Sequence, residues 1–243
     1  MTAFVGTVAV LLAAFVKGAV AFGFPTLATP LFALVVDVKS AIAILILPNL
    51  VMDAIQALRR PGLPATLRRH VVLYVSGVVG TFIGTYELKR FSDRQALLVL
   101  GAFIIVFVAL NVSRWQFRVD PARERYLSVP AGLVVGIMGG ITNAHGTPLV
   151  LYLYALGLEK AEFVRAVSLG FIVYKAAQFV AVTQAGMMTL RLFGWSVVAS
   201  AVALGGFGLG LRVQDRMNQA AFNRAVLIVL TGLGAFLIFR SLR

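Results

Sequence analysis

The stretch GFPTLATPLFALVVDVKSAIAI (23–44) is echoed by ITNAHGTPLVLYLYALGLEKAEF (141–163) later in the same chain. The pairs Thr29-Pro30 and Thr147-Pro148 lie 118 residues apart, each in a Gly- or Pro-marked break within an apolar stretch. A duplicated, interrupted hydrophobic segment is the strongest sequence indicator of a substrate site in a secondary transporter. The repeated stretch therefore predicts a membrane transporter whose site lies at the two breaks.

The composition indicates a protein that resides in the bilayer. Of the 243 residues, 60% are hydrophobic and 13% are charged, and the mean hydropathy is +0.94. Long apolar runs recur from end to end, and a helix needs about 20 apolar residues to cross the hydrocarbon core. Strand-like alternation is weak, which favours helices over a barrel. We therefore expect an all-α polytopic membrane protein with one integral membrane domain, 1–243.

The net charge of +13 does not indicate nucleic-acid binding, because most Lys and Arg residues stand at the ends of apolar runs. Membrane proteins place topology signals and contacts with anionic lipid headgroups there. The segment MTAFVGTVAVLLAAFV (1–16) contains no Lys or Arg. A cleaved signal peptide begins with a basic region, so we expect this segment to be a retained first helix.

Hydropathy divides the chain into two similar halves. The first repeat is 1–113, a basic linker is 114–126, and the second repeat is 127–243. We expect about eight full transmembrane helices and two short broken or re-entrant segments that follow the breaks. The expected helices are 3–22, 27–36 (short), 40–58, 71–88, 94–113, 127–142, 147–157 (short), 162–183, 192–211 and 222–240.

The repeat extends well beyond the Thr-Pro pairs. Asp53-Ala-Ile-Gln56 matches Lys175-Ala-Ala-Gln178, and Gly80 and Gly84 match Gly206 and Gly210. Matched positions at many points along both halves support an internal duplication.

Loop charge predicts that the two repeats are inverted. The loop 59–70 holds four Arg residues, whereas its counterpart 184–191 holds only Arg191. Cytoplasmic loops are enriched in Lys and Arg, so 59–70 is expected inside and 184–191 outside. The first helix and its short successor then form a hairpin, and both termini lie outside. A full first helix followed by a re-entrant segment would instead give parallel repeats.

The breaks carry the polar residues expected of a binding site. Non-helical backbone at membrane depth is tolerated only inside the protein or along a water-filled cavity, so we expect the two breaks to face each other there. The helix N-termini that follow them expose N–H groups and partial positive charge, which suit an anion. The candidate substrate-binding side chains at the breaks are Thr26, Thr29, Thr142, Asn143, His145 and Thr147. His145 is either a proton relay or a neutral side chain that fills the break.

Four further residues within apolar segments are candidate substrate ligands. Lys17 and Lys175 are cations that would attract an anion, although Lys17 could instead extend towards an interface. Asp53, the counterpart of Lys175, is expected either to pair with Lys175 or to lie in water near the cytoplasm. Gln56 and Gln178 either donate hydrogen bonds to an oxyanion or bond between helices.

The sequence offers little for catalysis or for a metal. It contains no HExxH, GxSxG or P-loop motif, no Cys, and only two His residues, His70 and His145. We therefore expect no cofactor and no metal site.

The repeated motifs resemble those of the sulfite exporter (TauE/SafE) family. The likeness rests on GFPTLATPLFALVVDVKSAIAILILPNL (23–50) and GGITNAHGTPLVLYLYALGLEKAEFVRAVSLG (139–170), each followed by a Gly-spaced helix. Phe22-Gly23-Phe24-Pro25 departs from the commoner run of glycines in the first motif. The resemblance implies a two-repeat permease of the bacterial cytoplasmic membrane that exports sulfite or other small sulfur-containing anions.

We thus predict a transporter that exports a small oxyanion, sulfite or an organosulfonate, by alternating access. The expected partners are this anion, anionic lipids and, as a possibility left open, further copies of the chain. The rival hypotheses are a carrier for an amino acid or a metal ion, a membrane-embedded enzyme acting on a lipid phosphate, and a non-transporting membrane anchor. The metal carrier and the enzyme would need more clustered polar or acidic residues than this chain has.

Overall fold

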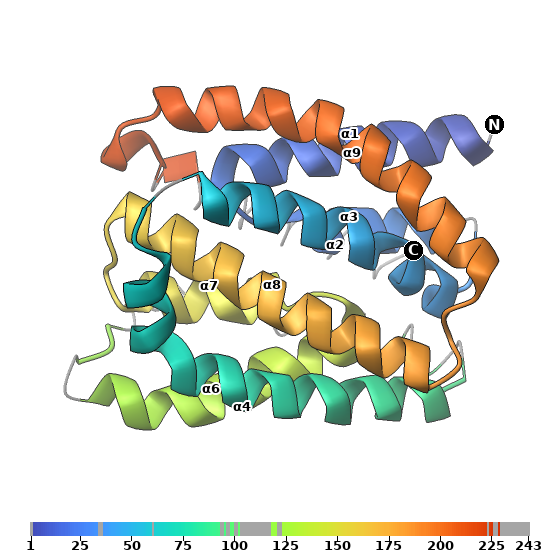
Figure 1. Ribbon diagram of the computed structural model, residues 1–243, viewed down its shortest axis with the longest axis horizontal. Helices are drawn as coiled ribbons and strands as arrows, with labels where there is room; N and C mark the ends of the chain where they lie inside the picture. The colour runs from blue at the N-terminus through green and yellow to red at the C-terminus, as the bar shows by residue number, and fades with distance from the viewer. Residues whose placement is uncertain are drawn as a thin grey trace.

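The computed structural model describes residues 2–33, 36–59, 61–92, 95, 98–99, 102, 118–120, 123–222, 224–225 and 228. These residues form a bundle of helices, and no strand occurs among them (Figure 1). The helices are α1 (Thr2–Val20), α2 (Phe24–Phe32), α3 (Val38–Leu58), α4 (Leu63–Arg90), α6 (Glu124–Thr142), α7 (Gly146–Ala155), α8 (Lys160–Gln184) and α9 (Leu190–Arg216).

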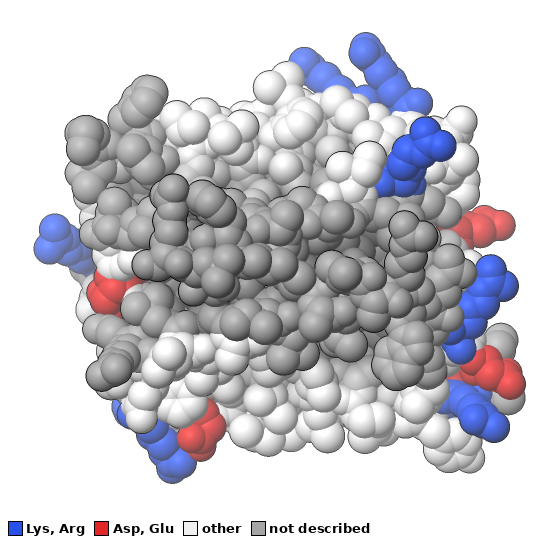
Figure 2. All heavy atoms as spheres, turned by 180° about the vertical axis from the view of Figure 1, so that it is seen from behind, with Lys and Arg blue, Asp and Glu red and all other residues white. Residues whose placement is uncertain are grey.

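Five of these helices, α3, α4, α6, α8 and α9, are long and apolar enough to cross a membrane. Most of the charged side chains in Figure 2 lie near the left and right ends of the face shown, and further Lys and Arg side chains protrude along its upper right edge. This distribution matches a bilayer core flanked by two headgroup regions. The protein is therefore a multi-pass cell-membrane protein. The expected helices 94–113 and 222–240 lie almost entirely outside the described residues.

The two segments expected to be too short to span the membrane are short in the structure. Helix α2 has 9 residues and α7 has 10. Before α2 the backbone turns through left-handed conformations at Ala21 (φ 73°) and Gly23 (φ 100°), and before α7 through Asn143 (φ 66°). Glycine and asparagine adopt this conformation most readily, so each break has a local cause.

The prediction that 59–70 forms a loop is wrong. Helix α4 begins at Leu63, directly after Gly62 (φ 105°), and Pro64 occupies its first turn. Proline is tolerated there because the missing N–H would have no helical partner anyway. The helix continues through a kink at His70 (φ −102°, ψ 15°). Arg68 and Arg69 are thus helical, and only residues 59–62 separate α3 from α4.

The helices approach each other most closely at glycine residues. Helix α1 packs along α9, α4 packs along α6, and α3 packs along α8 near the middle of the bundle. A Cβ at Gly136 would overlap the carbonyl oxygen of Gly77 in α4, and a Cβ at Gly210 would overlap that of Phe15 in α1. Small residues let helix backbones approach closely in membranes, where van der Waals packing drives association. The Gly-spaced helices α4 and α9 therefore approach α6 and α1 closely.

Candidate functional site

The two breaks meet inside the protein. Helices α2 and α7 contact each other, and the side-chain Nδ2 of Asn143 donates a hydrogen bond of 2.9 Å to Thr29 Oγ1. Thr29, Asn143 and Thr147 are all buried. The two breaks thus face each other, as the sequence predicted. The side chain of Asn143, the left-handed residue of the second break, bonds directly to the first.

Lys175 in α8 points its ammonium at the second break. Its Nζ donates to Asn143 Oδ1, to the Asn143 carbonyl oxygen at 3.3 Å and to Gln178 Oε1 at 2.6 Å. The side chain is completely buried, and among the described residues no carboxylate lies within ion-pairing distance of Nζ. All its acceptors are therefore neutral oxygens, so a proton carried by this buried amine has no carboxylate partner among the described residues.

Asp53 pairs with Lys17, and the expected pair with Lys175 is wrong. Lys17 Nζ in α1 lies 2.7 Å from Asp53 Oδ1 in α3, and both side chains are 0% exposed. Asn49 Nδ2, one turn earlier in α3, donates to Asp53 Oδ2 at 3.0 Å. Lys17 Nζ also lies 4.2 Å from the centre of the Phe171 ring. Lys17 therefore does not extend to an interface, and Asp53 is not in water at the bundle surface.

The two glutamines at matched positions have different partners. Gln178 accepts from Lys175 and donates through Nε2 to the Gly139 carbonyl at 3.2 Å, next to the second break. Gln56 instead donates to Gln214 Oε1 in α9 at 3.3 Å. Gln178 thus belongs to the cluster around Lys175, whereas Gln56 makes a bond between α3 and α9.

His145 fills the second break. Its ring stacks on Tyr174 with centroids 5.6 Å apart, and its Nε2 lies 3.3 Å from Thr81 Oγ1. A Cβ at Gly139 would overlap the ring, so glycine at 139 makes room for it. These contacts match the alternative in which the histidine packs the break.

The threonines at the breaks differ in whether their hydroxyl groups have hydrogen-bond partners. Thr142 Oγ1 donates to the Met138 carbonyl at 2.6 Å and accepts from the Ala144 N–H at 3.2 Å. Thr147 Oγ1, in contrast, is buried without a hydrogen-bond partner among the described residues. Thr26 is buried in the first turn of α2. A buried hydroxyl without a partner costs free energy, so Thr147 is suited to a ligand.

The helices that follow the breaks begin without side-chain caps. Gly23 precedes α2 and His145 precedes α7, and neither makes a side-chain capping bond in the described structure. Uncapped N-termini leave first-turn N–H groups and a partial positive charge exposed to whatever lies beside them. Helix α7 directs this end towards the region of Asn143 and Thr147.

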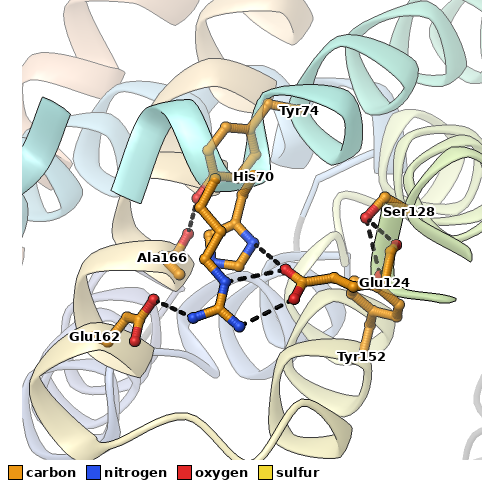
Figure 3. A network of polar contacts seen from close by, with 8 residues as sticks. His70, Tyr74, Glu124, Ser128, Tyr152, Glu162 and Ala166 are labelled. Atoms are coloured by element: carbon orange, nitrogen blue, oxygen red, sulfur yellow. Dashed lines mark hydrogen bonds and ion pairs between the residues drawn. The ribbon is translucent and has the colours of Figure 1, made fainter. Parts of the chain in front are cut away.

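A second polar cluster, absent from the sequence analysis, lies at the end of the bundle that carries the loop 59–62 (Figure 3). Arg69 in α4 holds Glu124 of α6 through two bonds of 3.2 and 3.0 Å, and Glu162 of α8 through a bond of 2.7 Å. His70 Nδ1 lies 3.4 Å from Glu124 Oε1. The Tyr152 hydroxyl donates to the Glu124 carbonyl at 2.9 Å. We call Arg69, Glu124 and Glu162 the Arg69 network, which joins three helices.

No group of three or more His, Cys, Asp and Glu side chains that could hold a metal ion occurs among the described residues. The buried polar cluster instead combines two lysines and one aspartate with amides, hydroxyls and helix N-termini. Apart from Asp53, these groups present N–H and O–H donors or positive charge. The arrangement is chemically suited to an anion.

Comparison with known proteins places the chain in a family. The family model described as "Sulfite exporter TauE/SafE" matches residues 6–237, nearly the whole length. No curated protein and no solved structure was found to match the chain.

Proposed function

Because the chain belongs to the sulfite exporter TauE/SafE family of membrane transporters, we propose that it exports a small oxyanion by alternating access. The proposed substrate is sulfite or an organosulfonate. Export of an anion from a cell with a negative interior runs down the membrane potential and needs no other driving force.

The observation that carries this proposal is the buried amine of Lys175, whose hydrogen bonds go only to neutral oxygens. Ionisable residues within a membrane domain are costly and mark substrate pathways. An oxyanion beside Lys175 would replace weak acceptors with a charge-assisted hydrogen bond, which is roughly twice as strong as a neutral one.

Neighbouring groups at the breaks would complete the proposed site. The unpartnered Thr147 hydroxyl and the first-turn N–H groups of α7 would supply donors at the second break, which Lys175 contacts through Asn143. Thr26 and Thr29 would contribute from the facing break, and Thr29 is already bonded to Asn143. Lys17 would add positive potential, although Asp53 compensates most of it. Gln178 would orient Lys175. Gln56 would not contact the anion directly, because it bonds to Gln214 of α9.

Alternating access by two inverted repeats is supported by the packing. The contact of α1 with α9 has its counterpart in that of α6 with α4, and α3 and α8 contact each other as equivalents. The loops 59–62 and 185–189 lie at opposite ends of the bundle (Figure 1). We propose that the two halves rock about the breaks, and that the Arg69 network holds the cytoplasmic side closed.

Efflux from proteoliposomes tests the proposed function. The protein is reconstituted in vesicles loaded with radiolabelled sulfite, and a membrane potential, negative inside, is imposed. We expect potential-driven efflux from vesicles with the wild-type protein. We also expect the variant Asn143→Gly/Thr147→Val to lose at least about tenfold of this rate, which corresponds to about 1.4 kcal/mol. Glycine tolerates the left-handed backbone at 143, so the variant removes the amide without straining the turn.

The matched control is Thr85→Val. Thr85 is also buried with an unpartnered hydroxyl, but it lies in α4, and its backbone packs against Gly140 of α6. This variant is expected to keep wild-type flux. Equal fluxes in all three proteins would contradict the assignment of the site, and absence of flux from the folded wild type would contradict sulfite export.

A further inference from the structure

The buried interior of the bundle contains three ionisable charges that set its electrostatic balance. The sequence has nine acidic residues, and Asp93 alone lies outside the described part of the chain. Of the eight described, Asp53 alone is buried. The only buried Lys or Arg side chains among the described residues are Lys17 and Lys175. Helices α3 and α8 pack against each other, and the side chain of Lys17 extends from α1 to Asp53 of α3 and to the Phe171 ring of α8.

Two of the three charges cancel each other. Lys17 and Asp53 lie 2.7 Å apart, and Asn49 holds the second carboxylate oxygen at 3.0 Å. The hydrogen bonds of Lys175 go instead to Asn143 and Gln178. With Lys17 and Asp53 paired, the site can therefore carry at most one net positive charge, on Lys175.

We infer that the site accepts one net negative charge, and thus selects singly charged oxyanions over doubly charged ones. This inference rests on the proposed function, because it concerns the anion bound at the same site. A singly charged anion leaves the occluded interior neutral. A doubly charged anion of the same shape leaves one uncompensated negative charge in a low-dielectric interior, where isolated charge costs several kcal/mol even after relaxation. Hydrogensulfite or a sulfonate with a single charge fits this balance.

Two pairs of anions test the inference, because the members of each pair are similar in shape and differ by one charge near neutral pH. Methanesulfonate is compared with sulfate, and sulfoacetamide with sulfoacetate. Binding is read from the rise in unfolding temperature of the detergent-solubilised protein as each anion is added, since a ligand that binds the folded state stabilises it. We expect apparent affinities at least about tenfold higher for the singly charged member of each pair, a difference of about 1.4 kcal/mol. Equal affinities, or tighter binding of the doubly charged members, would overturn the inference.

Two variants locate the charge that is responsible. Lys17→Met/Asp53→Asn removes a cation and an anion together, so the net charge stays the same and the preference is expected to persist. Lys175→Met removes the cation that balances the anion, so even the singly charged member then leaves an uncompensated charge, and its apparent affinity is expected to fall at least about tenfold. Wild-type affinity for the singly charged member in a folded Lys175→Met variant would show that Lys175 is not the compensating charge. A folded double variant that loses the preference would show that Lys175 alone does not set it. Sulfite efflux measured in parallel separates the two proposals: efflux with equal affinities refutes only the charge selectivity, whereas no efflux refutes the export function.

Discussion

At the level of single residues, the buried ion pair of Lys17 with Asp53 is the contact whose loss should affect stability most. Removing one partner of a buried ion pair leaves the other charge uncompensated, which costs about 3–5 kcal/mol. We expect Asp53→Asn to destabilise the protein by about this amount, because Lys17 is 0% exposed and Asn49 offers it no negative charge. The free energy of unfolding in mixed micelles measures the change.

The charge-neutral double variant Lys17→Met/Asp53→Asn is the matching control. Replacing both members of a buried pair is often close to neutral, so this variant should recover most of the lost stability. Asp215→Asn, which breaks the partly exposed pair of Asp215 with Arg59, should cost less than about 1 kcal/mol. If the double variant were no more stable than Asp53→Asn, Lys17 would not be the reason for the loss.

At the scale of elements, helix α9 provides two glycines with opposite expectations. A Cβ at Gly210 would overlap the backbone of α1 at Phe15, whereas a Cβ at Gly208 would meet nothing within 4 Å. Gly210→Ala must push α1 and α9 apart, and overpacking of this kind costs about 1–3 kcal/mol. Gly208→Ala should be neutral or slightly stabilising, because alanine favours helix over glycine.

Thermal unfolding of the two alanine variants in detergent compares them directly, since both changes add one methyl group to the same helix. We expect a lower midpoint only for Gly210→Ala. Equal midpoints would mean that α1 and α9 do not depend on this close approach.

For the whole molecule, the first expectation concerns topology. The chain contains no cysteine, so single cysteines can be introduced without a background. Pro61→Cys and Met187→Cys place one thiol in each of the loops 59–62 and 185–189, which lie at opposite ends of the bundle. In intact cells a membrane-impermeant thiol reagent should label only the second, because the Arg-rich loop belongs in the cytoplasm. Labelling of both positions, or of Pro61→Cys alone, would contradict the proposed orientation.

The second expectation at this scale concerns opening of the cytoplasmic side. Arg69 bridges α4 with both α6 and α8, so Arg69→Gln removes all ionic contacts of the network. Partly exposed networks contribute modestly, at roughly 1 kcal/mol, which corresponds to a change of about fivefold in the open population. A cysteine in place of Ser168, which is buried in α8, should therefore react about fivefold faster with a thiol reagent in the Arg69→Gln background.

Arg90→Gln serves as the control for this experiment. Arg90 pairs with Glu87 within α4 itself and joins no second helix, so its loss should leave the reactivity of the cysteine at 168 unchanged. Equal acceleration in both backgrounds would indicate general loosening of the protein. No acceleration in either background would contradict the proposal that the Arg69 network holds the cytoplasmic side closed.

The membrane class, the short helices after each break and the polar content of the breaks were all predictable from the sequence. These features depend on apolar runs and on Gly, Pro and Asn, which act on the backbone within a few residues. The helical start of α4 was missed because four Arg residues within 59–70 suggested a loop, whereas Gly62 and Pro64 begin a helix that extends past the apolar run.

Only the tertiary structure decided which charged groups meet. Lys17, rather than the matched Lys175, pairs with Asp53, and Arg69 of α4 joins Glu124 and Glu162, which lie 55 and 93 residues away. Contacts between helices far apart in the sequence depend on how the helices cross and rotate. That geometry comes from the packing of glycines such as Gly136 and Gly210 against neighbouring backbones. The sequence by itself determined which polar groups enter the membrane, and helix packing determined that Lys175, among the described residues, is the buried lysine without a carboxylate partner.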